Sequence, residues 1–156
     1  MHDYSPPRFS KSARSKEDLA ILAIGPKIAL PFCVLVAVTT HQDRVSPVCD
    51  VARCFLVVET DGNREIGRSA VTLDAMALYD RARRMTSFGW DVLICGAISR
   101  PFQMMLTAGG LRVIPNTCGA VQDVVRAFFD GSIDHGSFRM PGCGCCGRGR
   151  RRRRGR

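Results

Sequence analysis

The chain has 156 residues, which is enough for one domain with terminal segments and too few for several domains. Hydrophobic residues make up 46% of it, which excludes disorder along the whole length. The net charge is +9, but seven arginines lie in residues 148–156, so the rest of the chain carries only +2. The eight cysteines do not indicate a secreted disulfide scaffold, because Cys33 and Cys95 lie in apolar runs where free thiols pack as small hydrophobic groups. We therefore expect a cytoplasmic protein.

The N-terminal part begins polar and basic, and residues 1–32 are expected to form a partly disordered extension. Residues 19–38 are mostly apolar and resemble a signal peptide or a membrane span. Pro26, Lys27 and Pro31 interrupt this stretch, and no small-residue cleavage site follows it. We therefore predict no membrane association.

Three strands are predicted in the first half of the folded part. Residues 33–40 form a continuous apolar, β-branched run, which is typical of a strand buried on both faces. A loop is expected over 41–50. Residues 52–60 and 64–73 are predicted to pair as a hairpin, because the Asp61-Gly62 pair between them suits the positive φ angles of a tight turn.

A helix is predicted over residues 74–89, ending at Gly89. Its apolar residues recur at helical spacing, so one face is expected to be buried. The predicted buried face holds Ala75, Leu78, Tyr79, Ala82 and Met85, and the arginines Arg81, Arg83 and Arg84 are expected to lie off it.

Strands and helices alternate in the second half. Residues 91–99 and 111–116 are predicted as buried strands. A helix is expected between them, with Ser99 as its N-cap, Pro101 in its first turn and Phe102, Met105 and Leu106 facing the core. A last helix is predicted over 119–131.

The predicted order of elements is β-β-β-α-β-α-β-α. It implies an α/β fold with a mixed five-stranded sheet and helices on both faces, the order found in ribonuclease H-like folds. We expect residues 33–131 to form this domain and residues 132–156 to form a flexible tail rich in cysteine and arginine.

A ligand site is expected where the parallel strands end, because open α/β sheets bind ligands there. Gly96 and Gly119 lie in turns that open helices, where free N–H groups favour an anion and glycine permits close approach. Cys118, His41 and Arg44 are expected at the same rim, although a solvated loop histidine is the simpler interpretation of His41. A ribonuclease-type two-metal centre is excluded, because the first strand carries no carboxylate.

The tail combines soft ligands with positive charge. Cys143, Cys145 and Cys146 can supply thiolates to a metal or a metal–sulfur cluster, or they can be incidental. The arginines from Arg148 to Arg156 suit polyanions, which include nucleic acids as well as anionic clusters. Of the other thiols, Cys118 is a candidate ligand, Cys49 is a weaker one, and Cys33, Cys54 and Cys95 are expected to pack in the core.

The stretches DRVSPVCDVARCFLVVETDG, DVLICGAIS, NTCGAVQDVVRAFFDG and FRMPGC, in this order and spacing, resemble the dinitrogenase iron–molybdenum cofactor biosynthesis family, of the NifX and NifB carboxy-terminal domain type. The resemblance covers about residues 33–143 and implies the ribonuclease H-like fold. It also implies a non-catalytic carrier or scaffold for an iron–sulfur or iron–molybdenum–sulfur cluster, with cluster donor and acceptor proteins as partners.

Two functions other than the carrier stay open from the sequence. The first is a nucleic-acid-associated protein that acts through its arginine tail. The second is a structural or regulatory module with an empty ancestral site.

Overall fold

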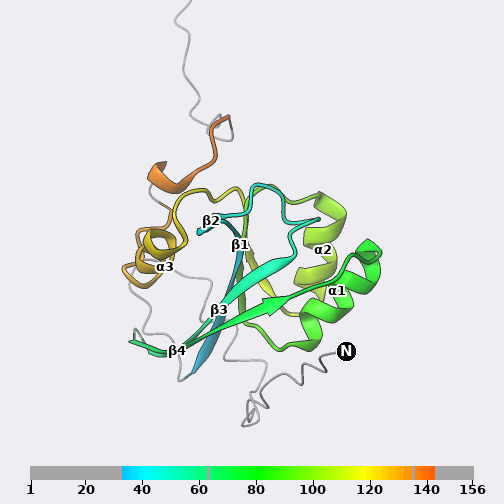
Figure 1. The fold of residues 1–156 in the computed structure, drawn as a ribbon, viewed down its shortest axis with the longest axis horizontal. Coiled ribbons are helices and arrows are strands. Elements are labelled where there is room, and N and C mark those ends of the chain that lie inside the picture. The colour runs from blue at the N-terminus through cyan, green and yellow to red at the C-terminus, as the bar shows by residue number, and fades with distance from the viewer. Residues whose placement is uncertain (1–32, 63, 135, 143–156) are drawn as a thin grey trace, which may run out of the picture.

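The computed structural model describes residues 33–142 except 63 and 135. It shows a mixed α/β fold in which helices lie on both sides of a central sheet (Figure 1). In chain order the elements are β1 (Val34–His41), β2 (Arg44–Val45), β3 (Cys54–Asp61), β4 (Arg64–Thr72), α1 (Leu78–Ser87), β5 (Val92–Ile94), α2 (Arg100–Ala108), β6 (Arg112–Ile114), α3 (Val121–Phe129) and the 3₁₀ turn η2 (Gly136–Phe138).

The sheet has the strand order β4-β3-β1-β5-β6, and β2 pairs separately with β1. β1, β5 and β6 are parallel, whereas β3 runs antiparallel to both β1 and β4. The predicted mixed sheet in an α/β fold is confirmed, but the sheet has six strands rather than the predicted five, because the short β2 adds a fourth strand before α1. The prediction of a loop over 41–50 is wrong in part, because Gln42 and Asp43 form a turn with positive φ angles of 48° and 61° that folds β2 back on β1. The assignment to the ribonuclease H-like folds stays a prediction.

Each face of the sheet carries its own hydrophobic core. Helices α1 and α2 cover one face with Leu35 and Ala37 of β1, and α3 covers the other with Val36 and Val38 (Figure 1). The alternation follows from the pleat, which turns successive side chains of a strand to opposite faces. Burying each large aliphatic side chain contributes about 1.5–3 kcal/mol, so β1 is held from both sides.

The first helix differs from its prediction. It begins at Leu78 rather than at residue 74, and Ala75 is exposed before it. Tyr79 was expected on the buried face but is 63% exposed, whereas Arg81 was expected off that face and is only 2% exposed. The buried stripe therefore consists of Arg81, Ala82 and Met85, and the reason lies in the partners of Arg81 described below.

Predicted helix ends are largely confirmed. Gly89 has a φ of 74° directly after the C-cap of α1, a conformation that favours glycine. Ser99 occupies the N-cap of α2, but its side chain makes no capping hydrogen bond. Phe102 and Leu106 of α2 are fully buried, as expected.

No helix in the described part of the chain is long and apolar enough to cross a membrane. The expectations for the extension 1–32 and for residues 143–156 concern segments outside the described residues. Within the segment 132–142, Ile133 is buried in the core that α3 covers.

Candidate functional site at the strand ends

Four of the predicted site residues gather at the carboxyl end of β1. His41 and Arg44 are register partners between β1 and β2. Arg44 in turn forms an antiparallel bridge with Ala120, and the Val45 N–H donates to the Gly119 carbonyl over 3.0 Å. The short strand β2 therefore joins the end of β1 to the turn that contains Cys118 and Gly119. Both His41 and Arg44 are exposed, so they place an imidazole and a guanidinium on this rim.

Gly96 has a different local environment from the one expected. A Cβ added there would lie 2.4 Å from the carbonyl oxygen of Ser46 and 2.5 Å from that of Pro47. The N–H of the next residue, Ala97, already donates to Pro47, and the N–H of Cys49 donates to Ala97. The absence of a side chain at position 96 therefore lets the chain's own backbone approach, and its role toward a ligand stays a prediction.

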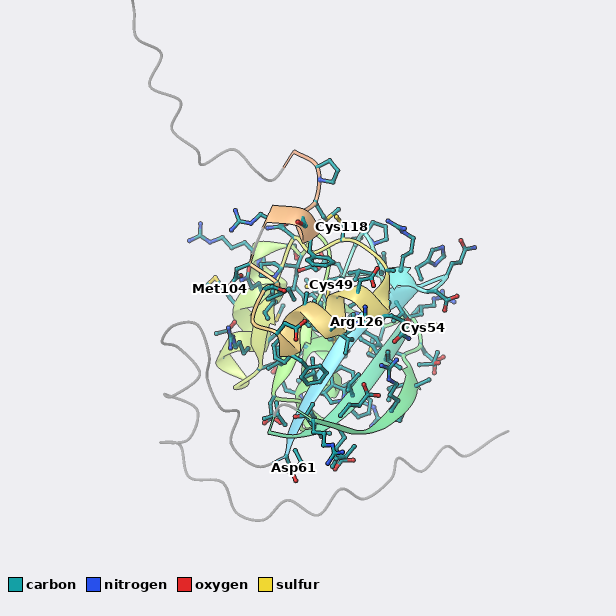
Figure 2. The ribbon with its side chains drawn as sticks, turned by 90° about the vertical axis from the view of Figure 1, so that its left-hand side faces the viewer. Cys49, Cys54, Asp61, Met104, Cys118 and Arg126 are labelled. Carbon is teal, nitrogen blue, oxygen red and sulfur yellow. The ribbon has the colours of Figure 1, made fainter. Side chains whose placement is uncertain are left out.

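Cys118 lies at the end of the sheet beside the C-terminal segment, opposite the end that carries Asp61 (Figure 2). Its side chain is half-buried, and its thiol donates to the carbonyl oxygen of Arg139 over 3.3 Å. Its backbone N–H donates to Phe138 over 2.7 Å, so this N–H is already engaged by the chain itself. Thr117 and Arg139 form an antiparallel bridge that fixes the two segments side by side.

The C-terminal segment thus returns to the predicted site before the described chain ends. The Met140 N–H donates to Asn116 over 2.9 Å, one residue beyond the bridge to Thr117. Cys143 follows Arg139 by four residues, and an extended chain of that length spans at most about 14 Å. Cys143, Cys145 and Cys146 lie outside the described residues, and the segment that leads to them contacts Cys118 at Phe138 and Arg139.

The described residues do not complete a metal centre by themselves. Among residues 33–142, without 63 and 135, no group of three His, Cys, Asp or Glu side chains could hold a metal ion. Cys118 therefore has no complete set of further metal ligands among them.

A second group of polar residues lies inside the core between the sheet and helices α1 and α2. Cys49 and Cys95 are both fully buried. The neighbouring Cys49 side chain, together with burial, raises the pKa of the Cys95 thiol far above its ordinary value. Core packing was predicted for Cys95 and is confirmed, whereas Cys49 does not face the solvent as a loop ligand would.

Arg81 belongs to this buried group. Its guanidinium carbon lies 5.8 Å from the centre of the Phe55 ring, which is a cation–π distance. Desolvation lowers the pKa of the guanidinium, and the nearby Cys49 and Asp50 act against that effect. A signal for this burial exists in the sequence, because Arg81 follows Leu78 by three residues and precedes Met85 by four.

The prediction that Cys54 packs in the core is wrong. It opens β3 opposite Thr40, at the end of the ladder, and is exposed there. Cys33 is half-buried at the other end of β1, where its thiol lies 3.4 Å from a carboxylate oxygen of Glu59.

Comparisons with solved structures show the same fold in other proteins. A putative dinitrogenase from Methanocaldococcus jannaschii aligns with a TM-score of 0.54 and 17% identity, over 64% of this chain and 90% of its own. The apo form of the orange protein from Desulfovibrio gigas aligns with a TM-score of 0.53 and 23% identity, over 74% and 98%. A putative NifB protein from Thermotoga aligns with a TM-score of 0.50 and 22% identity, over 64% and 90%.

A search of curated proteins found no match. The family model described as dinitrogenase iron–molybdenum cofactor matches residues 32–131. The match covers more than half of the chain and spans every strand and helix from β1 to α3. The chain therefore belongs to the dinitrogenase iron–molybdenum cofactor family.

Proposed function

We propose that this protein is a non-catalytic carrier or scaffold that binds an anionic metal–sulfur cluster during its biosynthesis, storage or delivery. The cluster, of the iron–sulfur or iron–molybdenum–sulfur type, is the cargo of the protein. Membership in the dinitrogenase iron–molybdenum cofactor family supports this class of function. Proteins that donate and accept the cluster are the expected partners, and the cytoplasm is the expected compartment.

The observation that carries the proposal is the contact between Cys118 and the segment that leads to the tail. The Cys118 thiol meets the carbonyl of Arg139, and the described chain ends three residues later. Cys118 is thereby close to the attachment point of Cys143, Cys145 and Cys146. Thiolates are the ligands that iron–sulfur clusters take from proteins, so this arrangement offers up to four of them from two segments.

Charge at the same rim supports an anionic cargo. Arg44 and Arg139 are exposed on either side of the turn at Gly119. The arginines from Arg148 to Arg156 follow the tail cysteines directly. A cluster with four thiolates and sulfide carries negative charge, and nearby guanidinium groups stabilise it in the bound state.

The test is anaerobic reconstitution of the full chain with ferrous iron and sulfide, followed by measurement of bound iron, acid-labile sulfide and the charge-transfer absorption. We expect stoichiometric cluster in the wild type. Replacing Cys118 with Ser, or the three tail cysteines with Ser together, is expected to abolish it. The matched control is Cys33→Ser, because Cys33 is a partly buried thiol at the opposite end of β1.

The variants also separate alternative sites. Cluster content that is equal in the wild type and in both test variants would move the binding elsewhere and contradict the proposed ligand set. A wild-type chain that stays colourless and free of metal would contradict the carrier function. Nucleic-acid binding through Arg148 to Arg156 would then be tested by truncation after residue 147, and it would not depend on any thiol.

A further inference from the structure

The buried polar group on the α1–α2 side of the sheet is separate from the Cys118 rim. Thr39 of β1 and Phe55 of β3 are register partners, and Arg81 of α1 lies over the Phe55 ring. Directly opposed residues share one face of a sheet, so Thr39 also faces α1. Asp50 joins Arg81 to the start of α2, because its charge acts on the guanidinium and its carboxylate accepts from the Ser99 N–H over 3.2 Å.

Four atoms of this group are buried without a hydrogen-bond partner. In the part of the chain that the structure describes, they are all of the buried side-chain nitrogen and oxygen atoms in that state: Thr39 Oγ1, Arg81 Nε, Arg81 Nη2 and Ser99 Oγ. Buried polar atoms in folded proteins normally have partners, and an unmet donor destabilises the fold. Thr39 and Arg81 both neighbour Phe55, and Asp50 relates Arg81 to Ser99, so one small ligand on this side of the sheet would account for all four atoms.

All four atoms can donate a hydrogen bond. Nε and Nη2 form the side edge of the guanidinium, which binds two oxygens of one anion in parallel. Thr39 is fully buried and Arg81 is 2% exposed, so water competes little for either group. A single ligand that meets several of these donors would carry several acceptors close together and would need no donor of its own.

We propose that Arg81, Thr39 and Ser99 form a binding site for a tetrahedral oxyanion, such as sulfate, phosphate or molybdate. Four oxygens on one centre match four donors, and the charge of the anion balances the buried guanidinium. Cys95 follows Ile94, which pairs with Val38, so Cys95 and Thr39 are the next residues along these two neighbouring strands. The site includes Thr39 near the carboxyl end of β1 and Ser99 after β5, on the side of the sheet that α1 and α2 cover.

A substitution at Asp50 distinguishes the oxyanion site from an ion pair between Arg81 and Asp50. Its carboxylate is half-buried and already accepts from Ser99, and its negative charge opposes an anion at Arg81. Asp50→Asn removes that repulsion and keeps an acceptor oxygen for the Ser99 N–H. The oxyanion site therefore requires tighter anion binding in this variant, whereas a direct Arg81–Asp50 ion pair requires a less stable protein and no gain in affinity.

The experiment is titration calorimetry of the full chain with sulfate, phosphate and molybdate in turn, against chloride at matched ionic strength. We expect saturable binding of at least one anion, weakened about 100-fold or more by Arg81→Met and about tenfold by Thr39→Val. Arg83→Met is the matched control, because it removes an exposed arginine of the same helix and should leave the affinity unchanged. The ranking of the three anions identifies the physiological class.

Two results overturn the proposal. Absence of saturable binding for all three anions would mean that water meets the four donors. Equal affinities in the wild type, Arg81→Met and Thr39→Val would place the anion elsewhere on the molecule. Because no cysteine takes part in the test, its failure leaves the cluster-carrier proposal standing, and failure of cluster reconstitution leaves the oxyanion site standing.

Discussion

Arg81 places its guanidinium carbon 5.8 Å from the centre of the Phe55 ring, so that a charged helix residue packs on the sheet where an apolar one would be expected. The aromatic face offsets part of the lost hydration of the charge. It does not satisfy the directional donors Nε and Nη2, which stay without a partner. The energetic cost of the unmet donors can be measured by replacing Arg81.

Arg81→Met should not destabilise the protein in chloride buffer without oxyanions. Methionine keeps the apolar stem and removes the unmet buried donors, so we expect the free energy of unfolding to stay constant or rise by about 1–2 kcal/mol. Urea denaturation followed by circular dichroism measures the change. Arg83→Met, on the exposed face, should change it by less than about 0.5 kcal/mol. A loss of several kcal/mol in Arg81→Met alone would show that Arg81 has a strong partner within the chain.

Gly96→Ala should be among the most destabilising single substitutions in the domain. The new methyl group would lie 2.4 Å from the Ser46 carbonyl oxygen, which is backbone and cannot rotate away. We expect a loss of about 3 kcal/mol or more in thermal or urea unfolding. Gly136→Ala adds a methyl group with no atom within 4 Å and serves as the control. Equal stability of the two variants would refute the close approach of residues 46 and 47.

Stability should fall at high pH because of Cys95. Its pKa is raised in the folded state, so above the ordinary value of 9.0 the unfolded chain releases a proton that the folded chain keeps. The folded state thus has its full stability below pH 9 and loses about 1.4 kcal/mol per pH unit above it for this thiol. Urea midpoints between pH 8 and pH 10.5 for the wild type and Cys95→Ser measure the effect. The variant should show the shallower slope, and identical slopes would contradict the prediction.

The thiols should divide into clearly separated reactivity classes. Cys54 is exposed at the start of β3 and should react with N-ethylmaleimide within minutes. Cys49 and Cys95 are fully buried and should react only when the protein unfolds. Peptide mass spectrometry after timed labelling assigns each rate without truncating the chain. Rapid labelling of Cys49 in the native protein would show that the loop containing it opens readily.

Glycines at turns and helix ends were the sequence signals that predicted the fold most accurately. The Asp61-Gly62 pair predicted the turn between β3 and β4, where Gly62 has a φ of 60°. Gly89 marked the end of α1 for the same reason. These signals succeed because glycine adopts positive φ angles without steric cost, whereas the positive φ angles of Gln42 and Asp43 had no such signal. The short strand β2 escaped prediction, because two residues are too few to show periodicity.

Burial of polar groups was harder to predict, because it depends on partners far away in the sequence. Arg81 has the spacing of a core residue, but a guanidinium counts as polar until Phe55 is known to lie beneath it. Cys54 has a strand-like context, yet its place at the end of the ladder leaves it exposed. At the candidate site, the sequence placed His41, Arg44, Cys118 and Gly119 at one rim. Nothing in the sequence indicates that the Cys118 thiol would contact the carbonyl of Arg139.

Because the chain returns to Asn116 and Cys118 at residues 138–140, the folded unit extends beyond the family match. The family match stops at residue 131, but Ile133 completes the core under α3, and the backbone groups of Asn116 and Cys118 bond to Met140 and Phe138. A chain cut at the family boundary would lose these bonds and the contact between the Cys118 thiol and Arg139. The smallest piece that keeps this end of the sheet paired therefore extends at least to Met140, beyond the unit that the family defines.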